Sequence, residues 1–532
     1  MRDFHQSGRS PVYGVNGMAA TSMPIASLTA IEVLRGGGNA VDAAVAACAV
    51  LAVVEPQSTG LGGDCFCLYA PAGSGKVVAV NGSGRSAAAA SLDAIEAKGA
   101  VPPDNVSPHT VTIPGAVSGW QLLLDAYGTK GFDELLVPAI RCAEQGFPMH
   151  QRVAWDWSMQ EEKLSRAGNR LFLPGGRAPR EGDLFVQTAL ARTLRAIAKR
   201  GAQGFYEGPV AADMAATLRA RGGVQTEEDF ANGLKSAEFV EAISLHWRGL
   251  DVWQCPPNGP GLVALMILGQ LEALGDAPDG PDGATRFHRH IEAARFAYRD
   301  RNAFLADPGR QETPASRLIA PDYLASLARL IDDEHALREL PPPGKSALAA
   351  SGDTVTLSVV DRDGNACSLI NSIYQMFGSG ILAESSGVLM QNRGLGFAFE
   401  RGHPNSLKPN ARPAHTIMPG MATLDGKPAI SFGVMGEHYQ PMGQTWVLTN
   451  AFEYGMDIQA AIDFPRVCPH LGEVEVERGI SQAMRLKLAA LGHKLTEVGR
   501  PLGGAQAIVI DRERGILIGG SDPRKDGAAL GY

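Results

Sequence analysis

Residues 353–380 read DTVTLSVVDRDGNACSLINSIYQMFGSG. Between Thr354 and Val359, apolar residues alternate with threonine and serine, the period of two that is typical of a β-strand. Asp363-Gly364 is a tight-turn signal, and a second apolar run follows it. The pattern therefore predicts a β-hairpin whose first strand opens at Thr354.

The segment before this hairpin has no periodicity. Three prolines, Pro341 to Pro343, are followed by glycine, alanine and serine up to Asp353, a composition that predicts a linker. If the Asp353–Thr354 bond is cut, Thr354 gains a free α-amine beside its own hydroxyl, and this amine serves as general base for the hydroxyl nucleophile. Alone the signal is weak, because most threonines at the start of a strand are structural.

Several separated blocks, in the same order, resemble the γ-glutamyltransferase family of N-terminal-nucleophile hydrolases. Residues 352–365 resemble the processing site of that family, and residues 37–45 resemble its first buried helix. The further blocks are Gly60–Gly63, Pro114–Gly119, Arg412-Pro413, Gly433–Gly436, Ser521–Arg524 and the closing Gly531-Tyr532. The likeness runs along nearly the whole chain.

The resemblance implies an α+β fold, the αββα sandwich in which two stacked antiparallel sheets lie between helical layers. It also implies one domain made of two fragments. Cleavage between Asp353 and Thr354 would leave a large subunit, residues 1–353, and a small subunit, residues 354–532, that begins with the nucleophile.

Local patterns agree with such a fold. Apolar residues recur at steps of three in residues 24–35, so we expect a helix with one apolar face there. Residues 40–54 are apolar nearly all round, so we expect a buried helix, capped by Asn39. Residues 284–304 form a long helical stretch. The expected strand pairs are residues 65–69 with 77–80, 421–424 with 429–432, and 507–510 with 516–518. Strands at both ends with helices between them predict sheets covered by helices.

The resemblance also implies catalytic roles. In the family, backbone N–H groups of paired glycines stabilise the oxyanion, and Gly436 and Glu437 occupy that place here. Glu437 replaces a glycine, but its backbone N–H survives the change. Ser372 corresponds to a family hydroxyl that orients the α-amine of the nucleophile. The structural alternative for Gly436 and Glu437 is an ordinary turn between strands.

Substrate recognition departs from the family pattern. Ser83 stands where transferases carry the arginine that binds the substrate α-carboxylate, and Arg85 lies two residues on. If the strand continues, Arg85 points to the same side and takes over this role. The acidic residue that binds the α-ammonium has no counterpart in residues 391–396, which instead hold Arg393. We therefore expect a substrate with a carboxylate and no amino group, as the divergent members oxamate amidohydrolase and the cephalosporin acylases suggest.

Three more residues fall at family substrate positions. Tyr374 replaces an asparagine, and His415 and Thr416 replace two serines, so we expect all three in the substrate pocket. His403 and His415 have no spacing around them that suits zinc, and a pocket or structural role is expected for both.

The composition of the chain excludes some classes of partner. The chain has 532 residues, 45% of them hydrophobic, with a net charge of −8 and no basic block, so nucleic acid and membranes are poor partners. No secretory signal opens the chain, and its longest apolar run, residues 43–54, is too short to span a bilayer. Seven cysteines without paired spacing, among them Cys65 and Cys67, suit reduced thiols. These features predict a cytoplasmic protein.

We therefore predict an amide-cleaving enzyme in which Thr354 attacks the carbonyl, its α-amine carries the proton and water releases the acyl group. No metal or organic cofactor is implied. The expected partners are a small amide substrate and the two fragments of the chain, with a homodimer left open. One alternative is a true γ-glutamyltransferase or glutathione hydrolase that uses Arg85 and an acid not located in the sequence. Another is an uncleaved, inactive member kept as a binding or scaffold protein.

Overall fold

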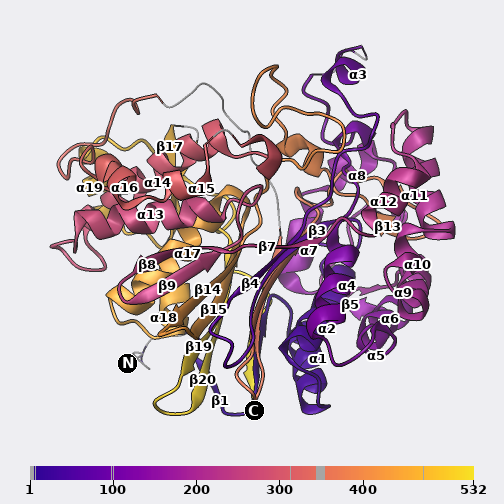
Figure 1. Cartoon of the computed structure of the whole chain (residues 1–532), viewed down its shortest axis with the longest axis horizontal. Helices are drawn as coiled ribbons and strands as arrows, with labels where there is room; N and C mark the ends of the chain where they lie inside the picture. Colours follow the sequence, from indigo (N-terminus) through magenta and orange to yellow (C-terminus); the bar gives the residue numbers. More distant parts are fainter. Residues whose placement is uncertain are drawn as a thin grey trace.

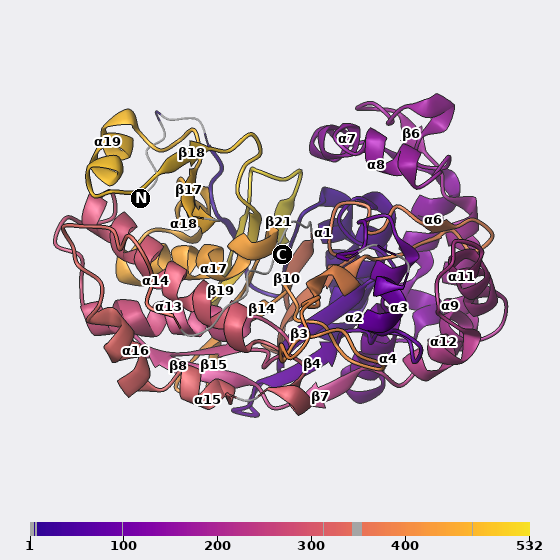
Figure 2. The same cartoon turned by 90° about the horizontal axis from the view of Figure 1, so that it is seen from above.

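A computed structural model describes residues 5, 8–97, 99, 101–311, 313–342, 354–470 and 472–532. Asp353, the first residue of the expected cleavage site, and most of the expected linker lie outside these described residues. Two seven-stranded sheets stand face to face at the centre of the molecule (Figure 1). Helices cover the outer face of each sheet, so the chain forms four layers, as the view from above also shows (Figure 2).

The first sheet holds the hairpin predicted around Thr354. Its strands, all antiparallel to their neighbours, are in spatial order β21 (Ala528–Gly531), β2 (Met18–Thr21), β10 (Val355–Val360), β11 (Ala366–Ser372), β3 (Asp64–Ala70), β4 (Val78–Gly82) and β7 (Glu238–Val240). β10 and β11 are central in the sheet and buried along their whole length, so the threonine and serine side chains that alternate with the apolar residues of β10 are buried as well.

The second sheet is also antiparallel. Its strands in spatial order are β1 (Val12–Gly14), β20 (Ile516–Ser521), β19 (Gly504–Asp511), β15 (Lys427–Met435), β14 (Pro419–Leu424), β9 (Leu250–Gln254) and β8 (Ile243–Trp247). Apolar side chains such as Phe66, Ile370, Met421 and Ile508 fill the space between the two sheets. This inner layer fixes how strand ends of one sheet face those of the other.

Each sheet has its own helical layer. α1 (Pro24–Arg35), α2 (Ala40–Val54) and α4 (Ala116–Tyr127) pack on the first sheet, with further helices such as α9 (Thr188–Arg200) and α11 (Pro209–Ala220) outside them. α13 (Gly261–Leu274), α17 (Gln440–Leu448) and α18 (Ile458–Asp463) pack on the second, and α14 (Ala284–Phe304) packs on α13. A small sheet of β16 (Val467–His470), β17 (Glu473–Val476) and β18 (Leu495–Glu497) lies beside α14.

The local predictions are largely confirmed. The helices at residues 24–35, 40–54 and 284–304 begin and end where the sequence indicated. Every residue of α2 is buried, and Asn39 caps it in a reciprocal capping box with Asp42. All seven cysteines are free thiols, which agrees with the expected reduced state. Within the described residues, no helix combines the length and apolarity needed to cross a membrane.

One geometric premise is wrong. Arg85 would share a face with position 83 only if the strand around Asn81 continued through it, but β4 ends at Gly82. The chain turns there because the Asp64 carboxylate accepts the N–H of Gly84, at 2.9 Å, in place of a ladder bond. Positions 83 and 85 are therefore not on one face of a strand.

Candidate active site

Strand register brings Thr354 to Ser372 at one end of the first sheet. Val355 pairs with Asn371 across β10 and β11, so Thr354, which directly precedes β10, lies beside Ser372. Ser372 in turn pairs with Asp64, the first residue of β3. The Thr354 hydroxyl is 1% exposed and donates to Ser372 Oγ at 3.2 Å. Three neighbouring strands thus present two hydroxyls and a carboxylate at one edge.

The second sheet supplies the opposite wall of the site. β15 leads directly into Gly436 and Glu437, and α17 then begins at Gln440, whose Nε2 donates to Thr354 Oγ1 at 3.5 Å. The two sheets approach so closely here that a Cβ at Gly433 would lie 2.0 Å from Oγ1 of Thr356. Glycine at position 433 therefore permits the contact between β10 and β15.

The turn after β15 has an unusual backbone. Gly436 has φ +126°, and a Cβ there would lie 2.5 Å from Cα of Gly503. Glu437 is a non-glycine residue at φ +58°, a conformation that costs about 1 kcal/mol or more. Burial raises the pKa of the Tyr374 phenol, and the Glu437 carboxylate adds to that shift while Arg393 opposes it.

A buried guanidinium adjoins the two hydroxyls. Arg393 is fully buried, donates to Ser372 Oγ at 3.2 Å and to Thr416 Oγ1 at 2.8 Å, and stacks on the Tyr374 ring at 4.3 Å. Burial lowers its pKa to about 10, so it is charged at neutral pH. Among the described residues, no carboxylate lies within ion-pair distance of Arg393, and its Nε has no hydrogen-bond partner.

Asp64 holds His415 in one tautomer behind this guanidinium. His415 Nδ1 accepts the backbone N–H of Ile417, so the ring proton is on Nε2, which donates to Asp64 Oδ2 at 3.1 Å. Burial, and then Arg393, lower the pKa of His415 to about 3, which keeps the ring neutral. The other Asp64 oxygen accepts from Gln391 and from two backbone N–H groups. Asp64 is therefore fully engaged within the protein.

Arg85 lies apart from these residues. Its Nη1 donates to the Asn410 carbonyl at 3.1 Å and pairs with Asp307 at 3.6 Å, and its side chain is 39% exposed. Ser83 is buried and bonded to Asn258. Within the described part of the chain, no contact joins Arg85 to Thr354, Ser372 or Tyr374. His403, also distant from the hydroxyls, bonds to the Asn302 carbonyl.

Sequence reasoning missed Asp64, Gln391 and Gln440. Asp64 follows the family block Gly60–Gly63, where two backbone segments approach closely: a Cβ at Gly63 would lie 2.3 Å from the Ser372 carbonyl oxygen. The glycine run was therefore a usable signal for Asp64. Gln440 carries no such signal, because its proximity to Thr354 depends on how the two sheets pack.

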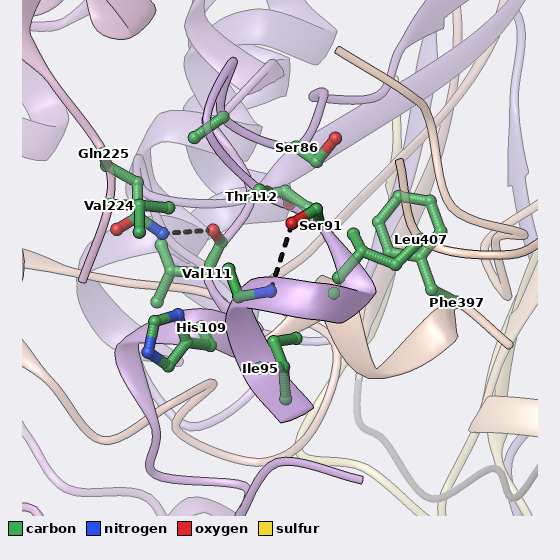
Figure 3. Close-up of a pocket in the computed structure, with 14 residues that line it drawn as sticks. Ser86, Ser91, Ile95, His109, Val111, Thr112, Val224, Gln225, Phe397 and Leu407 are labelled. Atoms are coloured by element: carbon green, nitrogen blue, oxygen red, sulfur yellow. Dashed lines mark hydrogen bonds between the residues drawn. The ribbon is translucent and has the colours of Figure 1, made fainter. Parts of the chain in front are cut away.

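Two cavities lie near these residues. One, behind Gly394, is lined by apolar side chains with a few polar groups such as Ser91 and Gln225 (Figure 3). Its volume of about 10 Å³ holds at most one water molecule, so it is no substrate pocket. The other has a volume of about 670 Å³ and is lined by Gly436 and Glu437 together with residues of β17 and the loop before β19.

Comparisons with known proteins agree with this arrangement. The family model described as Gamma-glutamyltranspeptidase matches residues 26–532. The Glutathione hydrolase-like YwrD proenzyme of Bacillus subtilis (strain 168) is 37% identical, over 98% of this chain and 99% of that protein. The Oxamate amidohydrolase proenzyme of Klebsiella pneumoniae is 35% identical, over 97% of this chain and 98% of that protein.

A solved structure extends the likeness to three dimensions. The cephalosporin acylase from Bacillus halodurans matches with a TM-score of 0.92 and 36% identity, over 100% of this chain and 98% of that one. These likenesses span the whole fold, both sheets and both helical layers. The chain is therefore an enzyme of the gamma-glutamyltranspeptidase family, with the αββα fold of the N-terminal-nucleophile hydrolases.

Proposed function

We propose that this enzyme is a self-processing threonine amidohydrolase that acts on a small amide with a carboxylate and no amino group. In the processing step, the Thr354 hydroxyl attacks the Asp353 carbonyl carbon, the peptide C–N bond breaks and an ester forms. Water then hydrolyses the ester, leaving a carboxylate on Asp353 and a free α-amine on Thr354. The products are the large subunit, residues 1–353, and the small subunit, residues 354–532.

In turnover, Thr354 Oγ1 attacks the amide carbon of the substrate while the α-amine of Thr354 takes the hydroxyl proton and passes it to the leaving nitrogen. The 3.2 Å contact with Thr354 supports Ser372 as the group that orients the nucleophile. The backbone N–H groups of Gly436 and Glu437 bind the developing oxyanion, an interaction worth about 3 kcal/mol per donor. Water then hydrolyses the ester on Thr354 and restores the free enzyme.

We infer the substrate class from the burial and the contacts of Arg393. A buried cation without a close counter-charge is unfavourable by several kcal/mol. Among the described residues, no carboxylate lies within ion-pair distance of Arg393, although the charge of Asp64 acts on it from farther away. A substrate carboxylate beside Ser372 and Thr416 would supply a direct partner. Tyr374 and Thr416 would contact the same group from either side. Asp64 is the acid whose charge acts on Arg393, but its carboxylate already accepts hydrogen bonds from His415 and Gln391. An α-ammonium would therefore meet Arg393 rather than a free carboxylate.

A substrate panel tests this function. The purified enzyme is given oxamate, a glutaryl amide, the uncharged amide of the same size, and glutathione with and without a dipeptide acceptor. We expect the anionic amides to exceed glutathione in kcat/KM by at least about tenfold, a difference of about 1.4 kcal/mol in transition-state binding. Glutathione as the best substrate would instead favour a glutathione hydrolase, the activity in the name of one relative. No turnover on any amide would favour an inactive binding protein.

A further inference from the structure

Two histidines and a glutamate meet directly behind the turn that follows β15. His438 follows Glu437 in the single-turn helix η5 (Glu437–Tyr439), His470 ends β16 and Glu475 lies on β17. Because His470 pairs with Glu473, the side chain of Glu475 lies diagonally across the ladder from His470, on the same face. Segments more than thirty residues apart in sequence thus bring their side chains to one point.

Their ligand atoms are close together. His438 Nε2 lies 3.8 Å from Glu475 Oε2, and His470 Nδ1 lies 3.3 Å from Glu475 Oε1. The two imidazole rings face each other with their centroids 3.9 Å apart. His438 is only 8% exposed, yet neither of its ring nitrogens has a hydrogen-bond partner among the described residues. A buried imidazole with two unmade hydrogen bonds is rare and calls for a ligand that is not protein.

We propose that His438, His470 and Glu475 bind one divalent transition-metal ion of the zinc class. Imidazole nitrogen and carboxylate oxygen are the donors that such ions prefer, and two histidines with one glutamate form an established three-ligand zinc set. Metal–ligand bonds of about 2.1 Å in a tetrahedron place the ligand atoms about 3.4 Å apart. The separations of 3.3 Å and 3.8 Å, each to a different oxygen of Glu475, are near that value, and one ligand atom from each of the three residues lies within 4.8 Å of the others.

A large cavity reaches the side chains of His438, His470 and Glu475. All three residues line the cavity of about 670 Å³ that also reaches Gly436 and Glu437. Three basic residues of the cavity wall form ion pairs with the buried Asp156, which offsets part of their positive charge. They are Arg152, Arg500 and Lys525. Arg301 donates to Asn302 and keeps its positive charge, which acts against a cation near His438, so the Glu475 carboxylate must outweigh it. A bound ion would tie η5, and hence the turn at Glu437, to β16 and β17.

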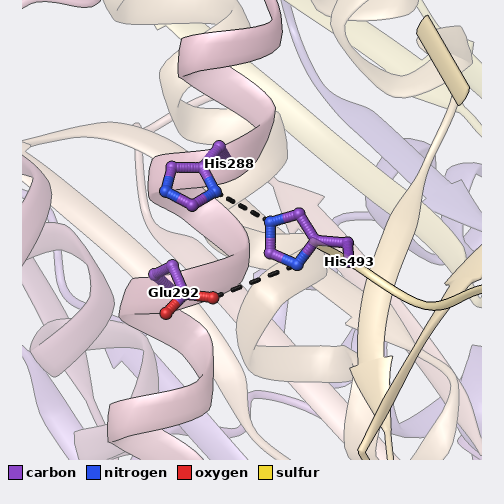
Figure 4. Close-up of side chains that lie close together, drawn as sticks. All are labelled: His288, Glu292 and His493. Atoms are coloured by element: carbon purple, nitrogen blue, oxygen red, sulfur yellow. Dashed lines mark hydrogen bonds and ion pairs between the residues drawn. The ribbon is translucent and has the colours of Figure 1, made fainter. Parts of the chain in front are cut away.

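A second cluster of the same composition provides a comparison. His288 and Glu292 lie on α14 and face His493 (Figure 4). Its groups already have protein partners: His288 Nε2 bonds to the Asp332 carbonyl, His288 Nδ1 bonds to His493 Nε2 at 2.8 Å, and Arg295 pairs with Glu292. This cluster therefore forms a hydrogen-bond network, whereas the ring nitrogens of His438 make no hydrogen bond within the described part of the chain.

The test is zinc binding to the full chain. Chelator-treated protein is dialysed against Zn²⁺ and its metal content measured, and the absorption spectrum is recorded with Co²⁺ in place of zinc. We expect one equivalent of zinc and the visible bands of tetrahedral cobalt. His470→Asn and Glu475→Gln, both at half-buried positions, should each weaken binding by at least about tenfold, the lower end of the effect of changing a metal-site residue.

Two control variants locate the site. His246→Gln alters an exposed histidine that pairs with Asp251 and should keep full binding. His493→Gln alters the second cluster and should also keep it, with circular dichroism confirming that each variant is folded. Equal zinc affinity in wild type, His470→Asn and Glu475→Gln would overturn the proposal. Loss of zinc in His493→Gln with retention in His470→Asn would overturn it as well.

Discussion

The Arg393 guanidinium donates to two hydroxyls and stacks on an aromatic ring, but no described carboxylate lies within ion-pair distance of it. Its planar fork suits a carboxylate because it offers two parallel donors, which lysine lacks. We expect Arg393→Lys to lower kcat/KM for anionic amides by about 30- to 100-fold, equivalent to about 2–3 kcal/mol. The loss should be much smaller for an uncharged amide of the same size.

Arg85→Lys is the matched control for this prediction. Arg85 has the same chemistry but is half-buried, bonded to Asn410 and paired with Asp307. This variant should keep wild-type kinetics on every substrate, as should Arg85→Ala. A large loss in Arg85→Lys together with normal kinetics in Arg393→Lys would assign the role of carboxylate anchor to Arg85, as its position two residues after Ser83 suggested.

The residues of the site differ in how far sequence could locate them. Thr354, Ser372, Tyr374, Arg393, His415 and Thr416 lie in or next to recognisable blocks, and the structure brings them together. Arg85 was misplaced because the end of β4 depends on a hydrogen bond to Asp64, twenty residues away. Gln440 was missed because its contact with Thr354 crosses from one sheet to the other.

At the scale of elements, the site depends on the close contact of β10 with β15. A methyl group at position 433 would lie 2.0 Å from Oγ1 of Thr356, so the two sheets would have to move apart. We expect Gly433→Ala to destabilise the protein by about 1–3 kcal/mol, as overpacking in a core does, and to slow self-processing. Urea unfolding and the rate of fragment appearance measure the two effects.

Gly309→Ala is the control for the change at position 433. No atom lies within 4 Å of the position that a Cβ at residue 309 would take. The stability and self-processing of the Gly309→Ala variant should therefore match those of the wild type. Equal stability of Gly433→Ala and wild type would show that the sheets do not need this close approach.

Elements were predicted well where the pattern was local. The capped and wholly apolar α2, the helix at residues 284–304 and the turns with Asp-Gly signals all follow from neighbouring residues. The order of strands within each sheet does not, because β2 lies between β10 and the C-terminal β21 through pairings across most of the chain. The family resemblance implied two stacked antiparallel sheets, and the order of the strands within them comes from the structure.

At the scale of the whole molecule, buried neutral histidines predict sensitivity to acid. Burial lowers the pKa of His290, His415 and His493 to about 3, whereas an unfolded histidine has a pKa of about 6.5. Below pH 6.5 the unfolded chain therefore binds protons that the native chain does not. The stabilisation is complete above that pH and declines as pH falls toward 3, by up to about 1.4 kcal/mol per pH unit for each histidine.

This prediction is best measured on the Thr354→Ala variant, which we expect to remain one chain, so that unfolding is unimolecular. Its urea midpoint should fall between pH 7 and pH 5.5. The same midpoint at both values would mean that these histidines titrate normally in the native state.

The central claim is that Thr354 becomes the N-terminal nucleophile of a cleaved enzyme, and intact-mass analysis with N-terminal sequencing of the purified protein tests it most directly. We predict two fragments, with the smaller one beginning at Thr354, and an uncleaved, inactive Thr354→Ala variant of 532 residues. Thr354→Ser keeps the hydroxyl and should still cleave. A small fragment with another first residue, an active Thr354→Ala variant, or an active wild type that remains a single chain would contradict the account.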